Sequence, residues 1–215
     1  MIYMENIFVC LAAPLLIAAF LVKGETRRFI GFFILGLTAC LLSAYINSYI
    51  AAAVAENGKA SLTMAQTLVQ LTPVCEEAMK ALPVLLFAAI LTPKRESIVA
   101  VAFAVGLGFG TFENCCYLMQ YGVMDLPFVL IRGFSAGVMH TICAAIIGNG
   151  LALIHGRGSL SAPATFALLC ASSTFHGIYN LLVASQGAWR TAGYLLPLIA
   201  AAALLVWRKH PKAIA

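Results

Sequence analysis

Long apolar runs, each close to the length of a membrane span, fill almost the whole of this chain. A helix needs about 20 apolar residues, at roughly 1.5 Å of rise each, to cross the hydrocarbon layer of a bilayer. Short polar breaks separate the apolar runs, which lie near residues 5–22, 29–50, 66–91, 97–121, 127–155, 163–185 and 191–207. The pattern predicts an all-α membrane protein, a seven-transmembrane-helix bundle that forms a single domain over residues 1–215.

Composition excludes a water-soluble fold. Hydrophobic residues make up 62% of the 215 residues and charged residues only 10%, whereas soluble globular domains contain about 45–50% and about 25%. So few charged side chains cannot form a polar surface around an apolar core in water. All 7 cysteines lie within apolar runs and none forms a C-x-x-C pair. We therefore expect reduced cysteines that pack as small hydrophobic residues, not a disulfide framework or a cysteine zinc site.

The distribution of basic residues predicts an orientation in the membrane. The first, third and fifth breaks and the C-terminal tail contain Lys23, Arg27, Arg28, Lys94, Arg95, Arg157, Arg208, Lys209 and Lys212, whereas the breaks on the other side contain only Lys59 and Arg190. The positive-inside rule therefore predicts a protein of the cell (plasma) membrane whose N-terminus lies outside the cell and whose C-terminus lies in the cytoplasm. The first run lacks a preceding basic segment and is expected to be a retained span. Topology thus explains the net charge of +5, and no nucleic-acid partner is needed.

Several ionisable side chains lie inside the predicted spans, where each costs about 2.5–3.5 kcal/mol at a helix centre. They are Glu76, Glu77, Lys80, Glu113, Arg132, His140 and His176. Glu76 and Lys80 are one helical turn apart and could neutralise each other. Glu113, His140 and His176 lie on three other spans, with no charged partner nearby in the sequence.

Four of these side chains share one depth. Counted from the cytoplasmic end of its predicted span, Glu76 lies 15 residues deep, Glu113 16, His140 15 and His176 13. At about 1.5 Å per residue, these positions lie roughly 20–24 Å above the inner boundary, in the outer half of a ~30 Å hydrocarbon layer. We therefore predict one common polar site, in preference to scattered polar contacts between helices.

Three kinds of chemistry use these residue types. Glutamate and histidine act as general bases and acids in hydrolysis. Glu113, His140 and His176 would also provide three ligands for a zinc ion that keeps an open water position. A proton or cation pathway would use the same residues. The residues alone leave all three chemistries open.

Four sequence motifs, in the same order as in a known family, coincide with this site. Residues 76–80 (EEAMK) resemble the E-E-x-x-K motif of the PrsW family of intramembrane proteases, and residues 112–117 (FENCCY) resemble its F-E-N-x-x-Y. Residues 132–140, followed by the small residues 148–150, resemble the third motif. Residues 175–180 (FHGIYN) resemble the last, L-H-G-x-Y-D.

The resemblance covers about residues 72–184 and departs from the family pattern at Phe175 and Asn180. Asn180 matches the H-x-x-x-N of the related CAAX prenyl endopeptidases. The resemblance implies a glutamate-dependent protease of the broader CPBP superfamily, whose substrates include membrane-anchored anti-sigma factors cut on the extracytoplasmic side. The family is also described as metal-dependent, although the sequence has no H-E-x-x-H zinc signature.

The resemblance further implies roles for individual residues, with Glu76 as the general base. The residues expected to be catalytic are Glu76, Glu77, Glu113, His140 and His176. The residues expected to support them are Lys80, Asn114, Tyr117, Arg132 and Asn180. If the protein uses a metal, the expected ion is zinc, with ligands Glu113, His140 and His176.

The sequence thus predicts an intramembrane endopeptidase that cleaves a membrane-anchored protein substrate near the outer leaflet, with that substrate and the lipid bilayer as its partners. Two alternatives remain. A non-catalytic seven-helix scaffold would keep intramembrane histidines, but it has no catalytic need for the adjacent Glu76 and Glu77. A proton-coupled transporter would have symmetric halves and broken helices, and the sequence contains no such repeat.

Overall fold

All regular secondary structure in the described part of the chain is helical. The computed structural model describes residues 4–56, 64–91, 93–121, 126–156 and 161–209. The elements are α1 (Met4–Leu21), α2 (Gly24–Glu56), α3 (Met64–Leu91), α4 (Arg95–Tyr121), α5 (Leu126–Ile131), the π-helical turn η1 (Arg132–Ala136), α6 (Gly137–Ile154), α7 (Ser161–Ala184) and α8 (Ala188–Lys209). The all-α prediction is confirmed, and each predicted apolar run is helical.

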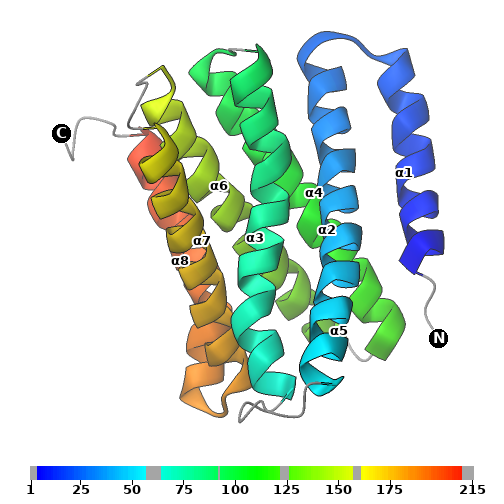
Figure 1. Ribbon diagram of the computed structural model, residues 1–215, viewed down its shortest axis with the longest axis vertical. Helices are drawn as coiled ribbons and strands as arrows, with labels where there is room; N and C mark the ends of the chain where they lie inside the picture. Colours follow the sequence, from blue (N-terminus) through cyan, green and yellow to red (C-terminus); the bar gives the residue numbers. More distant parts are fainter. Residues whose placement is uncertain (1–3, 57–63, 92, 122–125, 157–160, 210–215) are drawn as a thin grey trace.

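The helices form an up-and-down bundle (Figure 1). Because α5, η1 and α6 follow one another without a break, they act as one long helix. Successive segments run in opposite directions, so the start of α3 lies at the same end of the bundle as the end of α4 and the start of α5. Residues in these three regions can therefore meet, although they are far apart in the sequence.

Six of the described helical segments are long and apolar enough to cross a membrane: α1, α2, α4, the continuous α5–η1–α6, α7 and α8. Helix α3 has sufficient length at 28 residues, but its middle contains the charged residues Glu76, Glu77 and Lys80. Many large apolar side chains on the outside of the bundle are exposed, Phe20 at 82% among them. The protein is therefore a multi-pass membrane protein.

Helix α4 is packed at close range between α2 and α6. A Cβ atom at Gly108 would lie only 2.1 Å from the backbone oxygen of Phe33 on α2, and one at Gly106 only 2.7 Å from the Cβ atom of Ala144 on α6. Both distances are shorter than any real carbon contact, so these glycines allow the helices to approach. This close packing also fixes the distance between α4 and α6 where these helices contribute residues to the predicted site.

An apolar cluster fills one half of the bundle, between α3, α4 and α6. Its fully buried members include Ala81, Val84, Ile98, Val101, Ala102, Val105 and Ile147. They come from the second half of α3, the first half of α4 and the second half of α6, which all lie at one end of the bundle. The polar residues of the predicted site therefore lie toward the opposite end, where this cluster does not fill the interior.

Candidate active site

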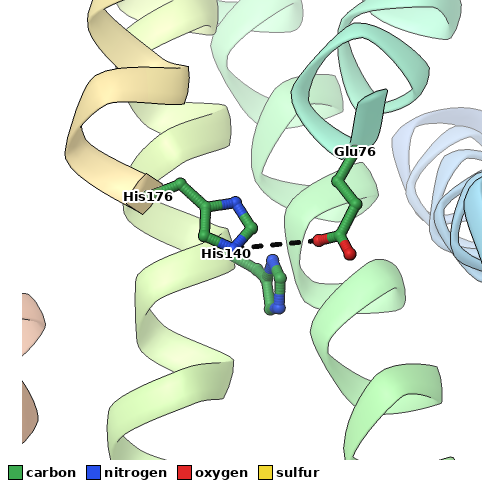
Figure 2. A group of neighbouring side chains, drawn as sticks. All are labelled: Glu76, His140 and His176. Carbon is green, nitrogen blue, oxygen red and sulfur yellow. Dashed lines mark ion pairs between the residues drawn. The ribbon is translucent and has the colours of Figure 1, made fainter. Parts of the chain in front are cut away.

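The predicted site residues from four helices meet inside the bundle. The Nε2 atom of His176 on α7 lies 3.8 Å from Oε2 of Glu76 on α3. The Nε2 atom of His140 on α6 lies 2.8 Å from Oε2 of Glu113 on α4. The two imidazole rings are perpendicular, with centroids 5.2 Å apart. Figure 2 shows Glu76 and the two histidines turned toward one another.

A cavity of about 360 Å³, which we call the Glu/His cavity, adjoins these residues. Its lining includes the predicted residues Glu76, Glu113, Tyr117, Arg132, His176 and Asn180. His140 and Lys80 are not part of this lining, and neither is more than 1% exposed. Asn114 lies elsewhere, on a separate cavity that also borders Gly137. The structure therefore places most of the predicted site at one cavity, with Asn114 outside it.

Glu77 lies behind the cavity and holds His176 in place. Its side chain is fully buried. The Nδ1–H of His176 donates to its Oε1 over 2.8 Å, and the Lys80 ammonium donates to the same atom over 2.5 Å. Ser172 donates to Oε2 over 2.7 Å. Glu77 was predicted among the catalytic residues, and the structure shows it in contact with His176 without lining the cavity.

Ser172 was not predicted as part of the site. It is fully buried, and besides its bond to Glu77 it lies 3.2 Å from the backbone oxygen of Cys143. A serine within an apolar span gives little signal by itself, because its hydroxyl can bond to its own helix. One signal was available: Ser172 precedes His176 by four residues, so the two share one face of α7.

The proton on His140 can be assigned from its two neighbours. The Lys80 ammonium lies 3.0 Å from Nδ1. An ammonium has only donors, so Nδ1 must accept a hydrogen bond. The proton of the neutral ring is then on Nε2, from which it donates to Glu113. Lys80 thus joins Glu77 to His140, and His140 joins Lys80 to Glu113.

Arg132 reaches the site from the π-helical turn. Its Nη2 donates to Glu113 Oε2 over 2.8 Å, and its guanidinium lies over the ring of Tyr117 at 3.5 Å. In the same turn, Ser135 donates to the hydroxyl of Tyr179 over 3.1 Å. A π-helical turn shifts the register of the residues around it and is frequent at functional sites. Here it accompanies two inward contacts, one to α4 and one to α7.

Among the described residues, no lysine or arginine pairs with Glu76, whose basic neighbour is His176 at 3.8 Å. Glu77 pairs with Lys80, and Glu113 pairs with Arg132. Within the described residues, Glu76 Oε2 is buried and has no hydrogen-bond partner. An unpartnered buried carboxylate oxygen costs free energy, and a catalytic role is one explanation for its presence in a folded protein. Glu76 is therefore the carboxylate that is free to act on a ligand in the cavity.

The same geometry fits a metal ion. Among the described residues, ligand atoms of Glu76, His140 and His176 lie within 4.8 Å of one another. This set has Glu76 where the sequence suggested Glu113, whose oxygen is already shared by Arg132 and His140. Glu76 offers its unpartnered oxygen, and His176 offers Nε2 because Glu77 holds its Nδ1–H, as ligating histidines require. To bind through Nε2, His140 would have to give up its contact with Glu113 and carry its proton on Nδ1, where the Lys80 ammonium now donates.

A multi-pass helical bundle with glutamate and histidine side chains around an internal cavity is an architecture suited to proteolysis within the membrane. The sequence model of the PrsW family intramembrane metalloproteases matches residues 25–207, and the chain belongs to this family. The resemblance deduced from the four motifs is thereby confirmed. Neither the curated proteins nor the solved structures contain a match to this chain.

Proposed function

We propose that this protein is an endopeptidase that cuts a membrane-anchored polypeptide near the outer leaflet, with water activated by Glu76 and His176. The observation that carries the proposal is the 3.8 Å gap between Glu76 Oε2 and His176 Nε2 at the edge of the Glu/His cavity. A distance of this size separates two hydrogen-bond acceptors that one water molecule can bridge. Because the chain belongs to a family of intramembrane proteases, we infer that this water attacks a peptide bond.

The contacts of the site support a separate part in the proposed reaction for each side chain. The bond to Glu77 places the proton of His176 on Nδ1, so its Nε2 faces Glu76 as an acceptor. A bridging water would donate one proton to His176 and one to Glu76. Glu76 takes its proton as the oxygen attacks the scissile carbonyl, and the proton then passes to the leaving amine. Asn180 follows His176 by one turn on the cavity lining and would donate to the developing oxyanion.

Purified protein tests this function directly. Single-span peptides in detergent micelles should be cut within the segment that lies in the outer half of the membrane, and the Glu76→Gln variant should fail to cut them. Fragment masses locate the cleaved bond. A wild-type protein that cuts no member of a broad peptide panel would favour a non-catalytic scaffold.

A zinc ion, when bound by Glu76, His140 and His176, would act as a Lewis acid on the substrate carbonyl. An ion at these residues would replace the bridging water, and Glu76 would then be a ligand instead of the base. In that case, protein purified without chelators should contain one equivalent of zinc, and the His176→Ala and Glu76→Gln variants should lose it. Glu113→Gln should keep the ion, because Glu113 lies outside the ligand set. Mass spectrometry of the metal content measures this. A wild-type protein free of metal and fully active in excess chelator would establish the metal-free mechanism.

We propose seven spans, with the N-terminus outside and the C-terminus in the cytoplasm of the plasma membrane, and one domain over residues 1–215. Helix α3 qualifies as the seventh span because Glu77 and Lys80 are buried in the bundle and face no lipid. Reporter fusions made after Glu56 and after Leu91 should therefore lie on opposite sides. Phosphatase activity is expected for the first and cytoplasmic fluorescence for the second. Two fusions on the same side would remove α3 from the spans.

A further inference from the structure

A second cavity, which we call the aromatic pocket, adjoins the Glu/His cavity. Its volume is about 270 Å³. The two cavities share the lining residues Tyr117, Arg132, Tyr179 and Val183. The aromatic pocket is completed by Phe128, Ile131 and Tyr194. It is smaller than the roughly 300–1,000 Å³ of a small-molecule site, which suits it to a single side chain.

The walls of the aromatic pocket are suited to an uncharged occupant. They consist of aromatic rings and aliphatic side chains, with Arg132 as the charged residue in the lining. The charge of Arg132 is already engaged, because its guanidinium pairs with Glu113 and lies over the ring of Tyr117. A second carboxylate would compete with Glu113, and a second cation would be repelled. An apolar side chain would stack on the rings and displace water.

The aromatic pocket lies next to the proposed reacting groups, Glu76 and His176. Tyr179 follows His176 by three residues on α7, so the two side chains lie on the same face, one above the other. Its hydroxyl accepts a hydrogen bond from Ser135, which fixes the ring between the two cavities. Arg132, at the same boundary, donates to Glu113 over 2.8 Å. A side chain in the pocket would thus be attached to a backbone that passes Glu76 and His176.

We propose that the aromatic pocket is the subsite for a large apolar side chain, aromatic or branched aliphatic, on a substrate residue that directly flanks the scissile bond. The proposal rests on the endopeptidase function proposed above and adds the substrate class. It explains why an apolar cavity adjoins a cluster of charged and ionisable side chains. It also predicts that the enzyme chooses its cleavage site by side-chain size.

Peptide series that differ only at one flanking residue test the subsite. At one of the two flanking positions, phenylalanine or leucine should give a kcat/KM about 10-fold or more above that of alanine. Ile131→Trp fills the pocket and should reduce this ratio toward one, whereas Ile131→Ala should shift the preference to tryptophan. Leu130→Trp is the matched control, because Leu130 is 47% exposed against 42% for Ile131 and does not line the pocket. The ratio of the kcat/KM values of two peptides on the same enzyme does not depend on the fraction of enzyme that is folded, so partial misfolding of a variant would not change it.

A ratio that is the same in wild type and in both Ile131 variants would overturn the subsite and leave the endopeptidase standing. Such a result would be expected if a lipid chain occupied the pocket. Absence of any cleavage by the wild type would instead refute the endopeptidase. Binding gives a separate readout: on the Glu76→Gln protein, a peptide with benzoylphenylalanine at the preferred position should crosslink to α5 or α8, near Phe128 or Tyr194. Crosslinks confined to α1, α2 or α3, which contribute no residue to the pocket lining, would overturn the subsite irrespective of activity.

Discussion

Glu76→Gln should lower kcat/KM for a single-span peptide by about 100-fold or more, which is the usual contribution of a general base. The substitution keeps the size and shape of the side chain and removes its ability to accept a proton. Fragment formation, followed by mass spectrometry, measures the rate. Glu96→Gln is the matched control, because Glu96 is an exposed glutamate in the first turn of α4 and lies outside the Glu/His cavity.

Stability should separate this effect from a loss of structure. Among the described residues, Glu76 pairs with no lysine or arginine, and its buried Oε2 has no hydrogen-bond partner. Its replacement by a neutral amide should therefore leave the unfolding midpoint in detergent unchanged or higher, as is usual where function opposes stability. Near wild-type cleavage by a folded Glu76→Gln protein would exclude Glu76 as the base. Glu113, the other glutamate on the cavity lining, would then be the next candidate.

The helices were predictable from the sequence because two properties that determine them are local. Length and apolarity set each run, and the run near residues 127–155 corresponds to the continuous α5–η1–α6 within a residue or two. The π-helical turn inside that run was not predicted, because residues 132–136 have no composition that distinguishes a π-turn from an α-helix. Arg132 and Ser135 make their inward contacts from this turn, so the sequence did not predict these contacts either.

Depth along the membrane was predictable, and rotation about the helix axis was not. Rise per residue places Glu76, Glu113 and the two histidines at one level, and the structure brings all four together. Adjacent residues on a helix, however, point about 100° apart at 3.6 residues per turn. Glu76 therefore faces the cavity while Glu77 turns into the contact between α3 and α7. Sequence spacing within one helix does not indicate which of the two glutamates faces the cavity.

The same limit explains the ligand set. The sequence grouped Glu113 with the histidines because the three residues lie on successive spans at similar depth. In the structure, Arg132 from η1 pairs with Glu113, and this partner depends on the packing of η1 against α4. The carboxylate left for an ion or a water is Glu76. Contacts between helices, which the sequence does not record, thus separate the paired carboxylates from the one that we propose to react.

Lys80→Met should lower the free energy of unfolding by about 3–5 kcal/mol, the usual result of removing one partner from a buried ion pair. Methionine has a similar length and no charge, so the change leaves Glu77 fully buried without its cation. His140 would also lose the donor at Nδ1, which lies 3.0 Å from Lys80 Nζ. Unfolding in detergent, followed by circular dichroism, measures the stability. Arg28→Met is the control, because Arg28 pairs with Glu25 at 3.0 Å near the surface, where a pair contributes about 0–1 kcal/mol. Its further contacts, with Ser97 and the Phe87 ring, also lie outside the site.

The double variant Glu77→Gln with Lys80→Met identifies the cause of that loss. If the loss comes from an uncompensated charge, removal of the Glu77 charge as well should restore part of the stability, and the two effects should be strongly non-additive. Activity should not return with stability, because a glutamine at position 77 can no longer hold His176 as a charged acceptor does. Additive effects of the two substitutions would show that Lys80 stabilises the bundle through packing, including its contact with the ring of Phe109 at 4.7 Å, and not through Glu77.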